Sequence, residues 1–243
     1  MKQAETADGA MASPVDSALM IRVFYGFAVM AILSVAISVG GKWFGKSIAM
    51  AGHTDDTTLR EVVIGNDVLS VPANAIRFER ARRDGIAERL DLYLHWPDMQ
   101  GYSTEFRDDF DNVDGVRRIL FLGFERRLMS RDMSGRFDPI YRSLVEEGGK
   151  RGPGGVTIHA FKPNTGYLHE VLAVAERPGK TPFVARCLSG PSADESLAPC
   201  ERDLHVGRDM ALTYRFPQEL LGDWRRLDDA VTAAAARFVK TGG

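Results

Sequence analysis

Histidines are the residues of this sequence best suited to metal or acid–base chemistry, and the chain contains His53, His95, His159, His169 and His205. His159 and His169 fall on the two arms of one predicted hairpin, where facing side chains would lie roughly 5 Å apart and could share a metal. A register shifted by one residue would send them to opposite faces, and the sequence offers no third ligand. Two solvated or hydrogen-bonded histidines are the simpler interpretation, and we predict no metal site here.

Carboxylates are concentrated between Asp108 and Gly115, in the run DDFDNVDG, a composition found in calcium-binding loops. An EF-hand loop needs oxygen ligands at positions 1, 3 and 5 and a glycine at position 6. Counted from Asp109, position 5 is Val113 and the glycine falls at position 7, so the EF-hand pattern fails. Because clustered carboxylates can still coordinate a hard cation, a calcium site of another kind stays open as an alternative.

Nucleophilic catalysis has no recognisable motif in this chain. The arrangements G-x-S-x-G, H-E-x-x-H and S-x-x-K do not occur. Cys187 has no obvious histidine partner, and His95 with Asp98 lacks a nucleophile. The glycine-rich run 148–155 lacks the residue order of a phosphate-binding loop. Because the members of a triad can be scattered in sequence, a membrane-tethered hydrolase or metal-dependent enzyme stays the alternative function, and we predict no cofactor.

Cys187 and Cys200 are the two cysteines of the chain, too few for a disulfide scaffold or a four-cysteine metal site. They flank the run 188–199, which is polar, aperiodic and interrupted by glycine and proline. Such a segment has little packing of its own, so we predict that a disulfide closes it. Disulfides persist in the periplasm and rarely in the cytosol, so the pair also predicts an extracytoplasmic domain. Two unpaired thiols, with Cys187 buried in a strand, are the alternative.

The segment from Pro97 to Gly115 is a long connection without clear periodicity, which is typical of functional or mobile loops. It follows the best-defined strand, so its base is rigidly held. Irregularly spaced apolar side chains make it a candidate contact surface for a partner: Trp96, Met99, Tyr102, Phe106 and Phe110. Its carboxylates would suit a basic partner: Asp98, Glu105, Asp108, Asp109, Asp111 and Asp114. The alternative is that the aromatic side chains form a small core under the loop.

Strands joined by hairpins must position these residues. The clearest strand is Arg89–Trp96, where leucines alternate with polar residues, as in a half-buried antiparallel strand. Gly65 and Asn66 form a two-residue hairpin signal between two further strands. Besides residues 89–96, the predicted strands are residues 59–64, 67–71, 118–124, 156–161, 167–175, 182–188, 203–206 and 211–216.

Two helices are predicted within the globular part of the chain. Residues 138–148 read as a short helix with Asp138 as N-cap, Pro139 in its first turn and Gly148 at its end. Residues 217–238 carry an apolar stripe at the helical period, with charged residues on the other side. Strands with hairpin joints and a late amphipathic helix predict an α+β fold, a mostly antiparallel sheet with the C-terminal helix packed on it.

A single apolar segment, residues 23–41, carries no charge or proline and is long enough to cross a bilayer as one helix. We therefore predict four parts: a disordered tail 1–22, a transmembrane helix 23–41, a juxtamembrane linker 42–58 and a globular domain 59–243. A cleaved signal peptide is the competing interpretation, because Ala49-Met50-Ala51 has the form of a cleavage site. The absence of a positive flank and the length of the segment favour an uncleaved anchor.

Overall charge narrows the class of partner. The 243 residues have a net charge of −2, whereas nucleic-acid binders normally carry a basic surplus, so we predict no nucleic acid partner. Arginine outnumbers lysine, which is typical of GC-rich bacterial genomes. Basic residues flank both ends of the apolar segment, so the positive-inside rule does not orient it, and a cytoplasmic-facing regulatory domain stays open. The cysteines favour a domain in the periplasm. We therefore predict a single-pass inner-membrane protein whose periplasmic domain is a binding, assembly or accessory module for an envelope protein partner.

Overall fold

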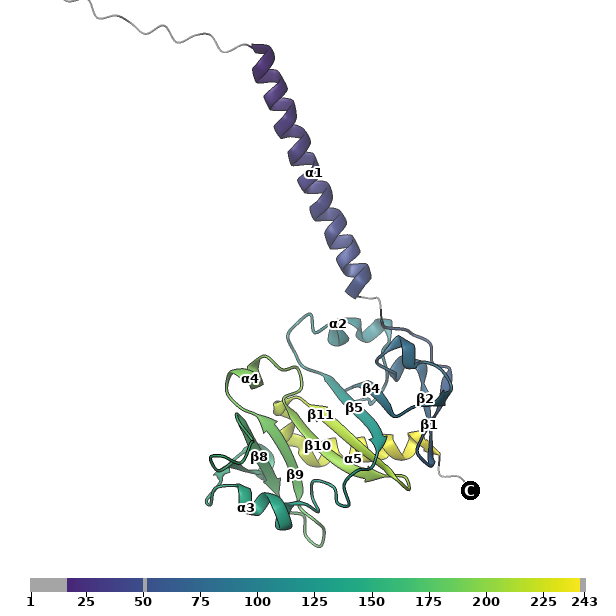
Figure 1. Ribbon diagram of the computed structural model, residues 1–243, viewed down its shortest axis with the longest axis vertical. Helices are drawn as coiled ribbons and strands as arrows, with labels where there is room; N and C mark the ends of the chain where they lie inside the picture. Colours follow the sequence, from purple (N-terminus) through teal and green to yellow (C-terminus); the bar gives the residue numbers. More distant parts are fainter. Residues whose placement is uncertain (1–16, 50–51, 241–243) are drawn as a thin grey trace, which may run out of the picture. The chain divides into compact units, whose positions relative to one another are not determined.

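The computed structural model describes residues 17–49 and 52–240. They fall into two compact units, divided between Ala51 and Gly52, and Figure 1 shows each as a ribbon. The described part of the first unit is helix α1, Ser17–Ala49. Its window Met20–Ser38 is long and apolar enough to cross a membrane, a property that a signal sequence shares, and none of the window is buried. Residues 1–16 of the predicted tail and Met50-Ala51 of the cleavage motif lie outside the described residues, whereas residues 17–22 already belong to α1.

The second unit contains a small sheet and a large sheet. The small sheet has the order β12-β2-β1-β3 and is built from β1 (Leu59–Ile64), β2 (Asp67–Pro72), β3 (Gly85–Ile86) and β12 (Val239–Lys240). The predicted hairpin at Gly65 is confirmed, because β1 and β2 pair antiparallel around it. Gly65 has a φ of +60°, a conformation that glycine adopts without strain.

The large sheet is antiparallel throughout and has the order β4-β5-β11-β10-β9-β8-β7-β6. Its strands are β4 (Arg89–His95), β5 (Ile119–Arg126), β6 (Lys150–Arg151), β7 (Thr157–Ala160), β8 (Glu170–Ala175), β9 (Phe183–Leu188), β10 (Cys200–Val206) and β11 (Met210–Phe216). Four helices accompany the sheets: α2 (Arg107–Phe110), α3 (Arg142–Leu144), α4 (Pro191–Asp194) and α5 (Trp224–Phe238). Short 3₁₀ turns cover residues 73–75, 79–81, 104–106, 153–155 and 218–223, and a π turn covers 137–141. The predicted α+β class is confirmed.

Helix α5 covers one face of the large sheet, which we call the inner face (Figure 1). Its buried residues Leu227, Val231, Ala234 and Phe238 recur at helical spacing and join the core formed by the inner-face leucines of β4 and β5. The predicted helix 217–238 is therefore present, although its first part, Gln218–Asp223, is a 3₁₀ turn. The amphipathic pattern of the sequence is thus satisfied by burying the apolar stripe on the sheet.

The predicted helix 138–148 is wrong in its extent. Residues 137–141 form a π turn, and α3 ends at Leu144. The Asp138 side chain makes no capping hydrogen bond and instead pairs with Arg142. Val145 is buried, has an extended backbone and forms a β-bridge with Phe161. The chain leaves the helix early because this contact buries Val145, a gain that local helix propensity does not include.

The large sheet consists of two halves joined through a short junction. Two register pairs connect β9 to β10, Cys187 with Cys200 and Arg186 with Glu201. By contrast, β10 pairs with β11 from Cys200 to Val206. The sulfur atoms of Cys187 and Cys200 lie 2.02 Å apart, at disulfide distance, so the cysteine pair sits at this junction.

Arg202 fills the space where β9 and β10 separate. Its side chain is 2% exposed. Its Nη1 donates hydrogen bonds to the Val184 carbonyl oxygen (2.9 Å) and to Ser134 Oγ (2.8 Å), and its Nε donates to Asp228 Oδ1 (2.9 Å). The buried Tyr214 hydroxyl donates to the same Asp228 oxygen at 2.7 Å. A buried guanidinium is tolerated here because its partners satisfy it and one of them carries the opposite charge.

Asp228 ties α5 to the sheet through this network. It also forms an ion pair with Arg177. Burial would raise the pKa of Asp228, but Arg202, the Tyr214 hydroxyl and Arg177 outweigh burial and hold the pKa below its usual value. The carboxylate therefore stays ionised in the interior and fixes the docking of α5.

Two small clusters cover the ends of the opposite, outer face. The α2 cluster consists of Tyr93, Tyr102 and Ile119, with Phe110 and Phe121 packed against them. The α3 cluster consists of Met133, Phe137, Tyr141, Val145, Phe161, Leu172, Val174 and Val184. Between these clusters, no apolar cluster of the described residues covers the outer face of β4, β5, β11 and β10, and half of its outward residues are charged.

Candidate binding site: a charged trough on the outer face of the sheet

Strand alternation brings polar residues from distant parts of the chain onto the outer face. One row of cross-strand neighbours runs Tyr93–Phe121–Arg215–Glu201–Arg186. The next row runs Asp91–Gly123–Thr213–Asp203, and the third runs Arg89–Glu125–Ala211–His205. Because residues two apart on a strand share a face, all three rows point away from α5.

Two cavities lie on these rows and meet at Thr213, which lines both. The first has a volume of about 310 Å³ and lies beside the α2 cluster. The second has a volume of about 400 Å³ and lies beside the α3 cluster, with Met133 and Tyr141 in its wall. We call the two cavities together the trough.

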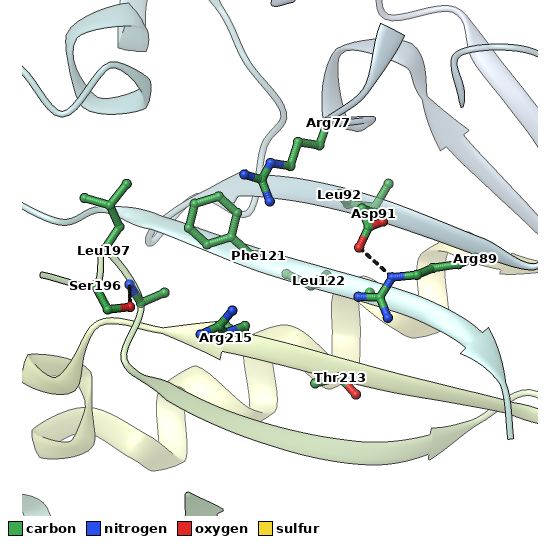
Figure 2. A pocket seen from close by; sticks show the side chains of 12 residues that line it. Arg77, Arg89, Asp91, Leu92, Phe121, Leu122, Ser196, Leu197, Thr213 and Arg215 are labelled. Carbon is green, nitrogen blue, oxygen red and sulfur yellow. Dashed lines mark hydrogen bonds and ion pairs between the residues drawn. The ribbon is translucent and has the colours of Figure 1, made fainter. Parts of the chain in front are cut away.

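The first cavity is rich in arginine (Figure 2). Arg89 donates to Asp91 Oδ1 and to Glu125 Oε2, both at 2.9 Å. Burial alone would lower the pKa of Arg89, but these two carboxylates outweigh burial and raise the pKa above its usual value. Arg77 and Arg215 are exposed, and neither forms an ion pair with any described residue. The cavity therefore contains one neutralised guanidinium and two that are free to meet an anion.

Gly123 makes room for the Arg89 pair on the floor of the first cavity. A Cβ atom on Gly123 would collide with the Arg89 guanidinium and would lie 3.4 Å from Asp91 Oδ1. A larger residue would therefore push Arg89 away from Asp91. This close approach gives Gly123 a packing role within a central strand, where glycine otherwise weakens the structure.

The residues 188–199 form one wall of the first cavity. Ser196, Leu197 and Ala198 line it, and Leu197 is 47% exposed at its rim. Arg117 Nη2 donates to the Asp194 carbonyl oxygen at 2.7 Å and so connects α4 to the residues that follow the predicted contact loop 97–115, which we call the acidic loop. The cysteine pair closes the base of this wall, because Cys187 and Cys200 flank it.

Glu201 and Asp203 line the second cavity, Glu170 lies outside its lining, and each of the three faces an arginine. Arg186 Nε donates to Glu170 Oε2 at 2.8 Å, and its Nη2 contacts Glu201. Arg136 pairs with Asp203. Burial raises the pKa of Glu170 and Asp203 above the usual range even though these arginines oppose it. The lining of this cavity contains four arginines, and each of them forms an ion pair, unlike Arg77 and Arg215 in the first cavity.

The predicted contact loop, residues 97–115, directs its candidate contact side chains inward, whereas Val113 is exposed. Met99 is 7% exposed and Tyr102 is 4% exposed. Phe106 stacks on His95 with a centroid distance of 4.1 Å, and Phe110 packs against Tyr102 at 5.3 Å. Trp96, the fifth candidate, packs against the main core. The structure thus packs all five candidates against other residues of the domain, and their role as a partner contact stays a prediction.

His95 holds the acidic loop in place. Its Nδ1 lies 3.2 Å from Asp98 Oδ2, and its Nε2 lies 2.8 Å from Asp109 Oδ2. Asp109 and Asp114 both pair with Arg118. With both ring nitrogens facing carboxylates, His95 has no nitrogen left to activate a nucleophile or bind a metal. His95 and Tyr93 lie on the face opposite the leucines of β4, as the alternation predicts, but the loop folds back over this face and buries both.

His53 occupies the other side of the α2 cluster. Its ring stacks on Tyr102 at 4.5 Å, and its Nδ1 lies 3.1 Å from the Tyr93 hydroxyl oxygen. Burial lowers the pKa of His53, although Asp111 opposes the change. The neutral imidazole is therefore favoured in the folded protein.

The predicted hairpin does not bring His159 and His169 together. His159 pairs with Leu172, and His169 lies outside β8 with a φ of +58°. Among the described residues, no group of three or more His, Cys, Asp or Glu could hold a metal ion. In the acidic loop, Asp109 and Asp114 are turned toward Arg118, which satisfies their charge without a cation.

Sequence reasoning missed the trough. The signal was present in ALTYRF, residues 211–216, and ERDLHV, residues 201–206, where polar and apolar residues alternate. That pattern indicates a strand with one uncovered face, but it does not show which other strands lie beside it. Arg77 comes from the turn before β3 and carries no pattern of its own.

Comparisons with known proteins give the fold a precedent. No family model and no curated protein sequence match the chain. The chain is similar to Smlt3025, an immunity protein of the Stenotrophomonas maltophilia type IV secretion system, with a TM-score of 0.51 and 14% identity, covering 76% of this chain and 94% of that one. It is also similar to FrpD, an iron-regulated outer membrane lipoprotein of Neisseria meningitidis, with a TM-score of 0.41 and 11% identity, covering 76% of this chain and 96% of that one. The first likeness shows a shared fold, and the second is too distant to support a conclusion.

Proposed function

We propose that this chain is a single-pass, membrane-anchored accessory protein of the bacterial envelope, whose domain binds a protein partner in the trough. The anchor in this proposal is α1, whose length and composition suit a bilayer. The observation that carries the binding role is the uncovered outer face, where charged residues lie between two apolar clusters. A solvated sheet face needs no cavities, whereas a binding surface is hollowed and edged by apolar side chains.

The rims of the trough support a protein partner. Leu197 stands at the rim of the first cavity with 47% exposure. Leu128 and Met129 line the second cavity with 87% and 61% exposure. Exposed apolar side chains around a charged floor match a surface that pairs both apolar and charged groups of another chain. Smlt3025, which shares the fold, is an immunity protein of a secretion system, and this is compatible with an envelope binding role.

The periplasm is the compartment that we propose for the domain. Cys187 and Cys200 lie at disulfide distance, and disulfides persist outside the cytosol. The junction that the pair spans also forms the base of one trough wall. An oxidising compartment would preserve the disulfide and therefore the position of this wall.

An enzyme is the second candidate, favoured by the raised pKa values of Asp203, which lines the second cavity, and of Glu170, which pairs with Arg186 of that lining. Binding is preferred because each of these carboxylates faces an arginine, as expected of a structural ion pair. Asp203→Asn separates the two roles. A binding module keeps its partner with little change, whereas an enzyme that uses Asp203 as its acid loses turnover while retaining the bound substrate.

Site-specific photocrosslinking in cells of the native host tests the proposed function. A benzophenone amino acid at position 197 or 128 should yield a discrete adduct with one envelope protein. The same group at Arg237, which is exposed on α5, should yield none. Adducts at position 237 alone, or the absence of adducts at both trough positions, would overturn the proposal.

A further inference from the structure

We infer that the first cavity is a carboxylate-recognition site, which takes an acidic side chain of an extended partner segment between Arg77 and Arg215. This inference rests on the proposed function, since it names the chemistry of the partner that the trough binds. It is carried by two guanidinium groups that face one cavity and have no carboxylate partner among the described residues.

Arg215 is unpaired because its neighbours are already engaged. In its cross-strand row, Phe121 lies on one side and Glu201 on the other. Glu201 is bound by Arg186, which also holds Glu170. Opposite charges on adjacent strands normally pair, so the local arrangement leaves the Arg215 charge available.

Arg77 is held in position by aromatic rings instead of by an acid. Its guanidinium carbon lies 4.9 Å from the centre of the Phe121 ring and 5.1 Å from that of Phe78. Figure 2 shows Arg77 and Arg215 on two sides of Phe121. Because stacking fixes the plane of a guanidinium and leaves its N–H groups free to donate, Arg77 is prepared for an oxygen ligand.

The carboxylates near the cavity do not compete for these two arginines. Asp91 is bound by Arg89, which also binds Glu125. The lining contains three arginines against one aspartate, which is a surplus of two positive charges. An incoming carboxylate would therefore meet uncompensated charge and could accept paired N–H···O hydrogen bonds from a guanidinium.

The surroundings favour a carboxylate carried by a polypeptide over a free anion. Phe121, Leu197 and Ala198 line the same cavity, and a small anion has no group to place against them. The trough continues past Thr213 into the second cavity, whose rim carries Leu128. An extended segment can place its acidic side chain between the arginines and its apolar side chains on these rims.

Short capped peptides with Glu-Leu-Glu or Gln-Leu-Gln at their centre test this chemistry against the full-length protein in detergent micelles, by fluorescence anisotropy. We expect the Glu peptide to bind and the Gln peptide to bind at least tenfold more weakly. The R77Q/R215Q variant should lose about 100-fold in affinity for the Glu peptide, because a hydrogen bond to a charged group contributes roughly tenfold. The control R225Q/R237Q removes the same charge from α5 and should bind as the native protein does.

Three results of the peptide assay would overturn the inference: equal binding of both peptides, unchanged binding by R77Q/R215Q, or displacement of the Glu peptide by an equimolar amount of inorganic phosphate. A thermal midpoint of R77Q/R215Q close to that of the control shows that the fold is intact. Crosslinking from position 197 separates this inference from the proposed function. If R77Q/R215Q still forms the partner adduct, the inference fails and the proposed function stands. If the native protein forms no adduct, the proposed function fails.

Discussion

The inner and outer faces of the large sheet use arginine in opposite ways. Arg202 and Arg215 lie one register step apart on neighbouring strands, because Arg202 pairs with Tyr214 and Glu201 pairs with Arg215. Arg202 points inward, is 2% exposed and binds Asp228, Ser134 and a backbone carbonyl. Arg215 points outward and has no ion pair among the described residues. A buried charge must be paired or hydrogen-bonded within the fold, whereas a charge beside a cavity is available to bind a ligand.

The comparison predicts that inner-face charges determine stability and outer-face charges determine binding. Substitutions on the inner face should therefore lower the free energy of unfolding and leave the trough unchanged where the protein still folds. Substitutions of the free arginines Arg77 and Arg215 should weaken binding in the trough and change the free energy of unfolding little.

Asp228→Asn should have the largest effect. It leaves Arg202 and Arg177 without their carboxylate, and breaking a buried ion pair costs about 3–5 kcal/mol. Denaturant unfolding of the protein in micelles measures the loss. The neighbouring Asp229→Asn, which changes an exposed residue, is the matched control and should be close to neutral. Equal stability of the two variants would contradict the role given to the inner-face network.

Tyr102→Ala should have the second-largest effect. It should lower the free energy of unfolding by about 3 kcal/mol, because truncating a buried aromatic residue leaves a cavity. Tyr102 is 4% exposed and packs with His53 and Phe110 in the α2 cluster. A thermal melt decides between the core role and the predicted contact role of this loop. A variant that keeps its midpoint and loses its partner would show that the loop is the contact surface after all.

The pair Cys187–Cys200 should contribute about 2–3 kcal/mol, the value expected for closing a loop of this size. Reduction, or the double variant C187A/C200A, should lower the midpoint of unfolding by a corresponding amount and weaken trough binding, since the pair supports the wall that carries Leu197. Thiol labelling of the denatured, unreduced protein checks the bond itself. Two reactive thiols per chain would contradict both the bond and the periplasmic assignment.

Several of these elements could be predicted from the sequence because their causes are local. The leucines of β4 alternate, the stripe of α5 repeats at the helical period, and Gly65-Asn66 permits a tight turn. The cysteine pair was predicted because the sequence of the intervening loop is polar and aperiodic and offers little packing of its own. Each of these features depends on residues near one another in the chain.

The trough could not be predicted, because its floor is assembled from strands that the topology brings together. β4 and β5 meet β11 and β10 only in the folded sheet. The burial of His95 could not be predicted for a similar reason. Its strand has one polar face, but the following loop returns over that face and supplies Asp109 and Phe106 as partners.

Acidification should have a smaller effect through His53. Burial lowers the pKa of His53 in the folded protein, so the unfolded chain binds a proton more readily than the folded one. Stability should therefore be complete above the ordinary histidine pKa of about 6.5 and decline as the pH falls through and below it. Unfolding curves at successive pH values measure the decline, and His53→Gln should flatten it. A His53→Gln variant that declines as steeply as the native protein would assign the effect to other groups.

The R77Q/R215Q variant tests most directly whether the outer-face arginines serve binding. Neither residue has an ion pair to lose among the described residues, and Arg77 loses only its ring contacts at an exposed site, so the free energy of unfolding should fall by about 1 kcal/mol, well below the loss expected for Asp228→Asn. The decisive measurement is the yield of the partner adduct from a photocrosslinker at position 197 in intact cells, at matched protein levels. The yield should fall to background in R77Q/R215Q and stay at the native level in R225Q/R237Q. A native yield from R77Q/R215Q would contradict the assignment of these arginines to the partner.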